Sequence, residues 1–168
     1  MNSQLQVVIQ QAGGEDTKTV SEILLEAASW LRQQTTPMWR DNEFAPEAID
    51  ADAVSGLFFI GRVDGQSAGV IKFQLEDSLF WPDVPKGESA FVHRLAVRRR
   101  FARGVVSTPL LSWAVERTRD LGRSYLRLDC EASRLKLRAV YERFGFRHHS
   151  DKHVPPYFVS RYEYEIVP

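Results

Sequence analysis

Apolar and polar positions along the chain follow two periods, which predict a mixture of helices and strands. Apolar residues recur at three- and four-residue spacing after Glu15 and Asp16, from residue 107 to about 121, and after Ser133, which has the residue type of an N-cap. Pro46 suits the first turn of a further short helix, through about residue 54. Shorter apolar or alternating runs predict strands at residues 5–9, 57–63, 67–75, 91–97, 125–130, 146–149 and 158–167.

The order of these elements predicts the topology of a sheet. A strand at 91–97, a helix at 107–121 and a strand at 125–130 form a βαβ unit, which requires a parallel strand pair. Asp64-Gly65 is a turn dipeptide between two strands and predicts an antiparallel hairpin. We therefore expect an α+β fold in one domain spanning 1–168, with a mixed, mostly antiparallel sheet and helices on both faces.

Composition excludes several classes of protein. The apolar runs are far shorter than a membrane span, and no secretory signal pattern opens the chain, so no membrane partner is expected. Cys130 is a single cysteine, which cannot form an internal disulfide, and no metal-ligand spacing surrounds it. These features predict a cytoplasmic protein without a metal, and the cysteine is expected to be a packed thiol.

The net charge of zero conceals an asymmetry between the two halves of the chain. Residues 1–84 contain 5 Lys and Arg against 13 Asp and Glu, whereas residues 85–168 contain 17 against 9. The basic residues gather most densely at Arg94, Arg98, Arg99, Arg100 and Arg103. Such a stretch can bind the phosphates of a small ligand, contact nucleic acid, or pair with the acidic half of the chain.

The same arginines lie between a predicted strand and a predicted helix, where free backbone N–H groups and the helix dipole favour an anion. Leu95-Ala96-Val97, the arginine-rich turn, Phe101 and Leu110-Leu111 resemble the central motif of the GNAT superfamily of N-acetyltransferases. A second segment, Ala139 to Phe146 with the sequence AVYERFGF, resembles the ending of that superfamily's next helix. The resemblance covers residues 91–147 well and the rest of the chain by element order.

The resemblance implies binding of acetyl-coenzyme A (acetyl-CoA). The pantetheine arm would pair with the central strand, and the pyrophosphate would contact the loop that follows it. In this alignment Val105 stands where the family usually has its first glycine, so Val105→Gly is expected to relieve strain. The cofactor-binding positions implied are Leu95, Ala96, Val97, Ala102, Arg103, Gly104, Val105, Val106, Ser107 and Arg134.

Acetyl transfer to an amine needs a base for the amine proton and an acid for the leaving thiolate. Tyr141 matches the family's tyrosine position and is the expected acid. His93 is the expected base, because strand alternation puts it on the face of Leu95 and Val97 and because imidazole titrates near neutral pH. It also resembles a histidine on the corresponding strand of arylalkylamine N-acetyltransferases. Glu88 or water is the alternative base.

The acceptor is expected to be a small primary amine. Trp30, Trp39 and Trp81 lie in segments that line the acceptor pocket in the superfamily, although each suits a packed core equally well. Together with the acidic first half, they suggest a cationic acceptor with an apolar body. The alternative functions are a non-catalytic CoA-binding regulatory module of the same fold and a nucleic-acid binder. Nucleic acid is not the expected partner. Exposed strand edges, which often pair in such folds, are compatible with a homodimer.

Overall fold

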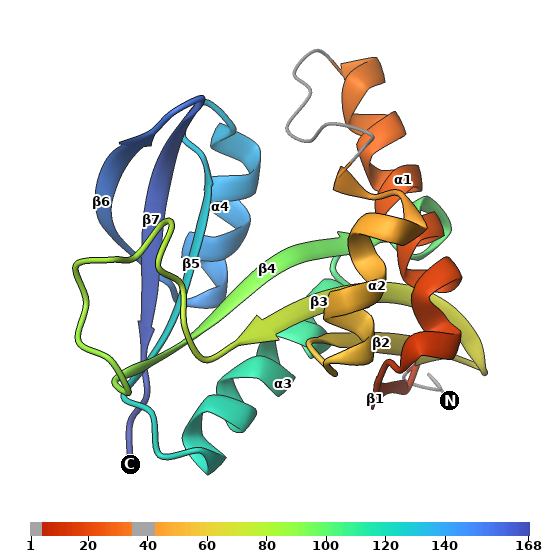
Figure 1. Ribbon diagram of the computed structural model, residues 1–168, viewed down its shortest axis with the longest axis horizontal. Helices are drawn as coiled ribbons and strands as arrows, with labels where there is room; N and C mark the ends of the chain where they lie inside the picture. Colours follow the sequence, from red (N-terminus) through yellow and green to blue (C-terminus); the bar gives the residue numbers. More distant parts are fainter. Residues whose placement is uncertain (1–4, 35–42) are drawn as a thin grey trace. The chain divides into compact units, whose positions relative to one another are not determined.

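The computed structural model describes residues 5–34 and 43–168, and Figure 1 labels the helices and strands. The predicted helices are confirmed as α1 (Thr17–Gln34), α2 (Pro46–Val54), α3 (Ser107–Asp120) and α4 (Leu135–Phe144), and two short 3₁₀ helices are η1 (Gly14–Asp16) and η3 (Arg99–Phe101). The strands are β1 (Val7–Gln11), β2 (Phe58–Val63), β3 (Gln66–Gln74), β4 (Ser89–Val97), β5 (Tyr125–Glu131), β6 (Arg147–Val154) and β7 (Tyr157–Glu165).

The strands follow the order β1-β2-β3-β4-β5-β7-β6. Strands β4 and β5 pair in parallel, as the βαβ pattern predicts, whereas β1–β2, β2–β3, β5–β7 and β6–β7 pair antiparallel. The predicted hairpin is confirmed at Asp64 and Gly65, whose φ angles of 49° and 76° give the left-handed turn that such hairpins favour. The mixed, mostly antiparallel sheet is therefore confirmed.

The chain divides by its contacts into two compact units, and the first contains residues 1–72 and 94–111. On one face of its strands, a buried cluster joins α1 and α2 to β2 and β3 through residues such as Ile23, Ile49 and Ile60. On the other face, Val106 and Leu110 of the α3 end lie over Gly69, where a Cβ would approach Val106 to 2.9 Å and the Ala96 carbonyl to 3.0 Å. Helices thus cover both faces of this part of the sheet.

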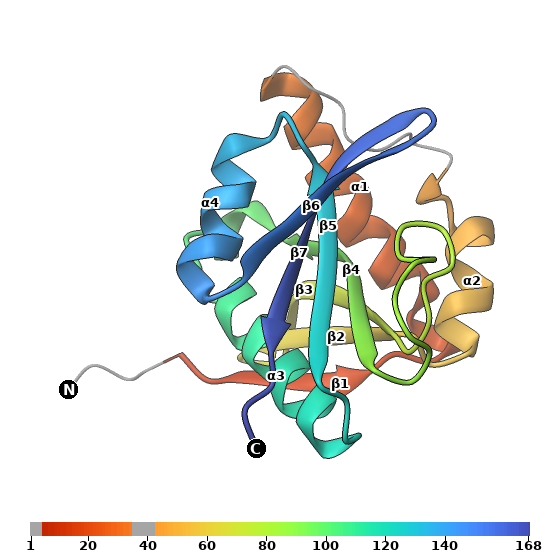
Figure 2. The same cartoon turned by 90° about the vertical axis from the view of Figure 1, so that its left-hand side faces the viewer.

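The second unit contains residues 73–93 and 112–168. Strands β5, β7 and β6 form its antiparallel sheet, and the first residues of β4, Ser89–Phe91, pair with Tyr125–Arg127 of β5. Helix α4 lies along this sheet (Figure 2) and packs through Tyr141, whose ring centre is 6.3 Å from that of Tyr162. The unit's buried charged residues, Arg127 and Arg161, both come from its strands.

Two local predictions are wrong. Ser133 does not cap α4, because the N-cap residue is Arg134 and its side chain makes no capping hydrogen bond. The predicted bounds 146–149 are also wrong: the expected strand is present as β6, but it runs from Arg147 to Val154, because it pairs with β7 along its length. Strand β6 therefore carries His148, His149 and His153.

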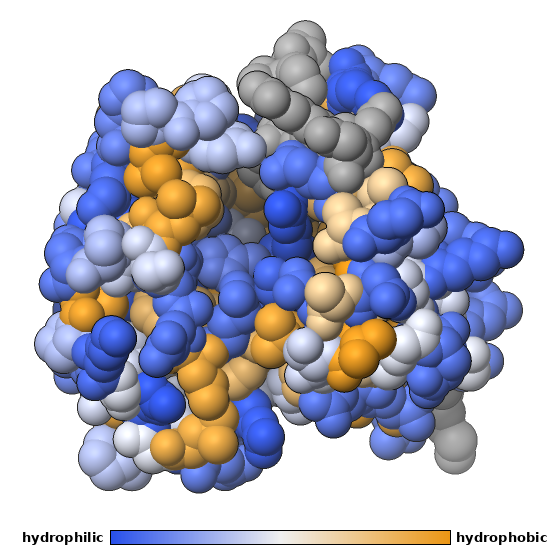
Figure 3. All heavy atoms as spheres, in the orientation of Figure 1, coloured by the Kyte–Doolittle hydropathy of each residue, from blue (hydrophilic) through white to orange (hydrophobic). Residues whose placement is uncertain are grey.

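No helix in the described ranges is long and apolar enough to cross a membrane. Hydrophilic side chains cover most of the face shown in Figure 3, and apolar ones are exposed there in small groups.

Candidate active site

The segment that follows β4, residues 98–107, is here called the arginine loop. The Arg98 amide donates to the Ala68 carbonyl at 2.8 Å, and the 3₁₀ helix η3 follows. Arg103 and Gly104 then have φ angles of 75° and 81°, and these two left-handed residues turn the chain into α3. Val105 has no positive φ, so the expectation that Val105→Gly would relieve backbone strain is wrong. The glycine that the turn needs is one position earlier.

The arginine loop presents backbone N–H groups at the start of α3. The amides of Ala102 and Thr108 donate to the carbonyls of Arg99 and Gly104 at 3.2 and 3.3 Å. Within the described residues, the amides of 103–105 and 107 make no hydrogen bond of good geometry. Unpaired amides at a helix N-terminus, where the helix dipole is positive, form a site for an anion.

Part of the basic stretch pairs with the acidic half of the chain. Arg94 lies 3.5 Å from a Glu43 oxygen, and Arg98 lies 3.8 and 3.7 Å from Glu22 and Glu26. The pairing interpretation is therefore confirmed for these two arginines.

The guanidinium groups of the other three arginines have no such ion pair among the described residues, although the Arg99 amide donates to a Glu26 oxygen at 3.1 Å. The Arg99 guanidinium stacks on the Trp30 ring at 3.7 Å, and the Arg100 guanidinium lies 4.9 Å from the Phe101 ring centre. Neither of these guanidinium groups nor that of Arg103 has a carboxylate partner among the described residues. Their positive charges remain for an anionic ligand.

The three tryptophans expected at the acceptor pocket have different surroundings. Trp30 is half-buried beneath Arg99, and Trp39 lies outside the described residues. Trp81 is only 2% exposed, so its expected role at the acceptor pocket is wrong and the core interpretation holds. Its ring packs between Arg161 and Arg127, with guanidinium carbons 4.5 and 5.3 Å from the ring centre.

His93 lies between two carboxylates, and these three residues are here called the Asp–His–Asp cluster. Its Nε2 is 3.0 Å from Oδ2 of Asp77, and its Nδ1 is 3.9 Å from Oδ2 of Asp129. The imidazole is 16% exposed, whereas the Asp77 and Asp129 side chains are 6% and 9% exposed. The histidine is therefore the most accessible member of a largely buried acidic group.

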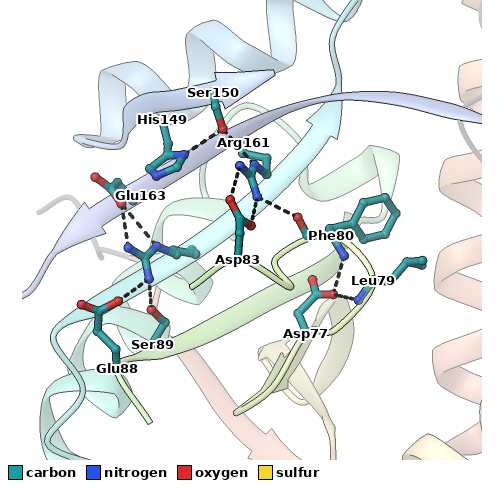
Figure 4. Close-up of polar contacts among 11 residues, drawn as sticks. Asp77, Leu79, Phe80, Asp83, Glu88, Ser89, His149, Ser150, Arg161 and Glu163 are labelled. Carbon is teal, nitrogen blue, oxygen red and sulfur yellow. Dashed lines mark hydrogen bonds and ion pairs between the residues drawn. The ribbon is translucent and has the colours of Figure 1, made fainter. Parts of the chain in front are cut away.

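Asp77 is held by the backbone of its own loop, which joins β3 to β4. Its Oδ1 accepts hydrogen bonds from the amides of Leu79 and Phe80 at 3.1 and 2.9 Å, which Figure 4 shows. Its Oδ2 is buried and makes no hydrogen bond of good geometry among the described residues, and it lies 3.0 Å from Nε2 of His93. Burial raises the pKa of Asp77, but His93 and the two amides outweigh it, so the net pKa is below its ordinary value.

Asp129 has the opposite character. Burial, the larger effect, and the negative charge of Asp77 raise its pKa to about 6, although His93, Trp81 and Arg161 act in the other direction. Its Oδ2 makes no hydrogen bond among the described residues. The cluster therefore pairs one firmly ionised carboxylate with one that is easily protonated.

Buried arginines secure the loop that carries Asp77. Arg161 donates to the Phe80 carbonyl at 3.0 Å and to both oxygens of Asp83 at 2.6 and 3.0 Å, contacts that Figure 4 includes. Arg127 pairs with Glu88 at 2.9 Å and with Glu163 at 3.1 Å. Glu88 is therefore occupied by a structural ion pair, which disfavours it as the alternative base.

Tyr141, the expected acid, is buried against Phe146 and Tyr162. Burial raises its pKa, and the neighbouring Cys130 and Asp129 raise it further, so the phenol keeps its proton. The Cys130 thiol is buried and has its pKa raised to about 12, which confirms a packed, unreactive cysteine.

The structure also bears on the cofactor position Arg134 and on the strand alternation used to place His93. Arg134 is half-buried at the start of α4, where burial lowers its pKa and the tyrosine of α4, Tyr141, opposes that change. Arg94 has a φ of 55°, so β4 is not uniformly extended there. The strand alternation that puts His93 with Leu95 and Val97 is therefore interrupted, and that argument no longer holds.

The Asp–His–Asp cluster also offers three ligand atoms within 4.8 Å of one another, which raises the question of a metal ion. However, the histidine faces Asp77 with Nε2 and Asp129 with Nδ1. A single ion binds one ring nitrogen and would therefore leave one of the two carboxylates facing the other nitrogen. The geometry suits an imidazole held between carboxylates better than it suits a metal.

The sequence analysis missed both carboxylates of this cluster. Asp77 follows β3 in a loop, and nothing in its sequence neighbourhood indicates a site. Asp129 alternates with Tyr125 and Arg127 along β5, so an acidic residue within a buried strand was the available signal.

Comparison with known proteins finds a relative of this chain and solved structures with the same fold. The chain is 29% identical, over 138 residues, to an uncharacterized N-acetyltransferase, YesJ, of Bacillus subtilis, a match that covers 79% of this chain and 77% of YesJ. A GNAT family acetyltransferase from Listeria monocytogenes has the same fold, with a TM-score of 0.82, 22% identity and 98% of each chain covered. The YncA structure from Salmonella typhimurium, with acetyl-CoA, has a TM-score of 0.72 and 15% identity, covering 97% of this chain and 95% of that one.

The model of one protein family, described as the acetyltransferase (GNAT) family, matches residues 24–146. This segment is more than half of the chain and includes the arginine loop, the Asp–His–Asp cluster and Tyr141. The chain therefore belongs to the acetyltransferase (GNAT) family and is an acyltransferase.

Proposed function

We propose that this protein transfers the acetyl group of acetyl-CoA to the primary amine of a small molecule. The observation that carries the proposal is the set of unpaired amides at residues 103–105 and 107, at the start of α3, in a chain of this family. A pyrophosphate is the anion that such a set binds, and YncA was solved with acetyl-CoA.

Several residues of the arginine loop contribute to binding the donor. Arg99, Arg100 and Arg103 supply positive charge that no described carboxylate neutralises. The ladder between β4 and β5 uses Ser89–Phe91, and the later β4 residues Leu95–Val97 supply backbone groups to the pantetheine arm. A backbone N–H of this segment stabilises the oxyanion that forms during transfer.

The second unit supplies the proton chemistry. His93 accepts the proton of the ammonium group, and the free amine forms a C–N bond with the acetyl carbon. The C–S bond then breaks, and Tyr141 donates its proton to the departing thiolate. The proton that the nitrogen loses as it becomes an amide nitrogen returns Tyr141 to its neutral form. Burial keeps Tyr141 protonated until that step.

The proposed reaction is tested by two measurements on the same preparation. Calorimetry with acetyl-CoA measures donor binding, and a thiol-reactive dye measures CoA release during a screen of primary amines. We expect binding in the micromolar to low millimolar range that is usual for enzymes, and amine-dependent release of CoA. Binding without release for every amine class would favour the regulatory module, and no binding at millimolar concentration would refute both functions.

Replacing Tyr141 by phenylalanine tests the acid. Tyr141→Phe removes only the hydroxyl, so the fold should survive while kcat falls by about 10²-fold. The matched control is Tyr164→Phe, because Tyr164 also packs among aromatic rings, those of Phe144 and Phe146. Full activity in Tyr141→Phe would return Tyr141 to a packing role.

A further inference from the structure

Each nitrogen of His93 faces a different carboxylate at a different distance, and this difference suggests different roles. Nε2 is within hydrogen-bond distance of Asp77 Oδ2, at 3.0 Å, whereas Nδ1 is 3.9 Å from Asp129 Oδ2. A neutral imidazole carries one proton and has one free lone pair. An ionised Asp77 accepts but cannot donate, so it favours the form of His93 with the proton on Nε2.

We propose that Asp77 is a positioning residue that holds His93 in the Nε2–H form, which leaves Nδ1 to accept the proton of the acceptor's ammonium group, with Asp129 as the charge partner of that nitrogen. This inference rests on the proposed function and names residues for its base step. The proton moves from R–NH₃⁺ to Nδ1, which gives R–NH₂ with a free electron pair and an imidazolium. That electron pair then forms the C–N bond with the acetyl group.

The surroundings of the cluster support this assignment of roles. Asp77 stays ionised, because its Oδ1 accepts hydrogen bonds from two backbone amides and its Oδ2 lies 3.0 Å from Nε2 of His93. Asp129 lies too far from Nδ1 for a hydrogen bond, but close enough to stabilise a positive charge that forms there. A largely desolvated site strengthens that attraction.

The charged and titratable groups around the cluster come from every element packed on it. The β3–β4 loop supplies Asp77, β5 supplies Asp129 and Cys130, β7 supplies Arg161, and α4 supplies Tyr141. The rings of Phe80 and Trp81 border the cluster. The ring centre of Phe80 lies 6.4 Å from that of His93. Among these groups, Asp77 and Asp129 are the ones that directly face the two ring nitrogens.

The test exploits the way Asp77 is held. In Asp77→Asn, the carbonyl oxygen of the new side chain is needed by the amides of Leu79 and Phe80. Its NH₂ group therefore takes the place of Oδ2 and donates to Nε2, which forces the proton of His93 onto Nδ1. We expect kcat/KM to fall by about 10²-fold or more, because the accepting nitrogen is blocked.

The tautomer itself is measured by ¹⁵N NMR of the full-length protein, with the His93 signals assigned by their loss in His93→Gln. We expect Nε2–H in the wild type and Nδ1–H in Asp77→Asn. The matched control is Asp83→Asn, in the same loop, which weakens the ion pair with Arg161 and leaves the tautomer unchanged.

The NMR result needs no turnover, so the inference and the proposed function can fail separately. A tautomer switch without acetylation of any amine would support the positioning role of Asp77 and refute the proposed function alone. An Nδ1–H form in the wild type, or an unchanged tautomer in Asp77→Asn, would overturn the inference. Stoichiometric binding of Zn²⁺ or Mn²⁺ that Asp77→Asn abolishes would overturn it as well, in favour of a metal site.

Discussion

The arginine loop and the Asp–His–Asp cluster differ in how the chain assembles them. The loop is one continuous segment, residues 98–107, and its groups are backbone amides and arginines of the same turn. The cluster brings together residues 77, 93 and 129 from a loop and two strands. A local segment can be recognised by its own sequence, whereas a cluster of distant residues exists only once the chain has folded.

The charged groups of the two regions also differ in their exposure to solvent. In the arginine loop, the side chains of Arg99, Arg100 and Arg103 are exposed, so water and salt screen their charges. In the cluster, two carboxylates are buried beside one imidazole, so each protonation change has a large energetic consequence. The loop is therefore suited to binding and the cluster to proton transfer, and three substitutions test this division.

The largest effect is expected from His93→Ala. Loss of the base should lower kcat/KM by about 10³-fold and remove its rise with pH, since general-base catalysis contributes about 10² to 10⁴. Calorimetry should show unchanged binding of acetyl-CoA, because the proposed donor contacts lie in the arginine loop and in the backbone of Leu95–Val97, not at the His93 side chain. Equal losses of binding and turnover would contradict the division between the two regions. If the pH profile of kcat/KM keeps its inflection in His93→Ala, another group is the base.

Asp129→Asn should change stability in a pH-dependent way. The native pKa is raised from 3.8 to about 6, so the folded state binds more protons than the unfolded state between these values, and stability falls as pH rises through them. At about 1.4 kcal/mol per pKa unit, the penalty above pH 6 is at most about 3 kcal/mol.

The asparagine variant removes this penalty. Urea unfolding should therefore show a larger free energy of unfolding than the wild type at pH 8, and nearly equal values at pH 4, while kcat/KM decreases. A variant that is less stable at pH 8 would show that the ionised carboxylate is a stabilising partner of His93. In that case, the cluster would also contribute to stability as an ion pair between Asp129 and His93.

The smallest effect is expected in the arginine loop. Gly104→Ala places a Cβ on a residue with φ 81°, which costs about 1–2 kcal/mol and disturbs the unpaired amides. Affinity for acetyl-CoA should fall about 10-fold in calorimetry. The matched control is Gly122→Ala, with φ 69° and no atom near its Cβ, which carries the same backbone penalty after α3. Similar affinities in both variants would show that the loop's conformation does not determine binding.

The sequence alone determined the elements and their order. Pro46 predicts α2 at its observed bounds, Asp64-Gly65 predicts the hairpin, and the βαβ spacing predicts the parallel pair of β4 and β5. These features depend on residues close together in the chain, because helix periodicity, turns and short connections are local. The motif of the arginine loop is local in the same sense, and so the family resemblance could be recognised.

Tertiary structure alone decided what surrounds each functional side chain. The sequence names His93 but not Asp77 and Asp129, since their proximity depends on how the β3–β4 loop is secured by Arg161 and on the pairing of β5 with its neighbours. The sequence also does not decide whether Trp81 lines the acceptor pocket or packs in the core, because burial is a property of the folded chain. Backbone strain is decided in the same way: the left-handed residues are Arg103 and Gly104, not Val105, because the start of α3 is set by the packing of Val106 against the sheet.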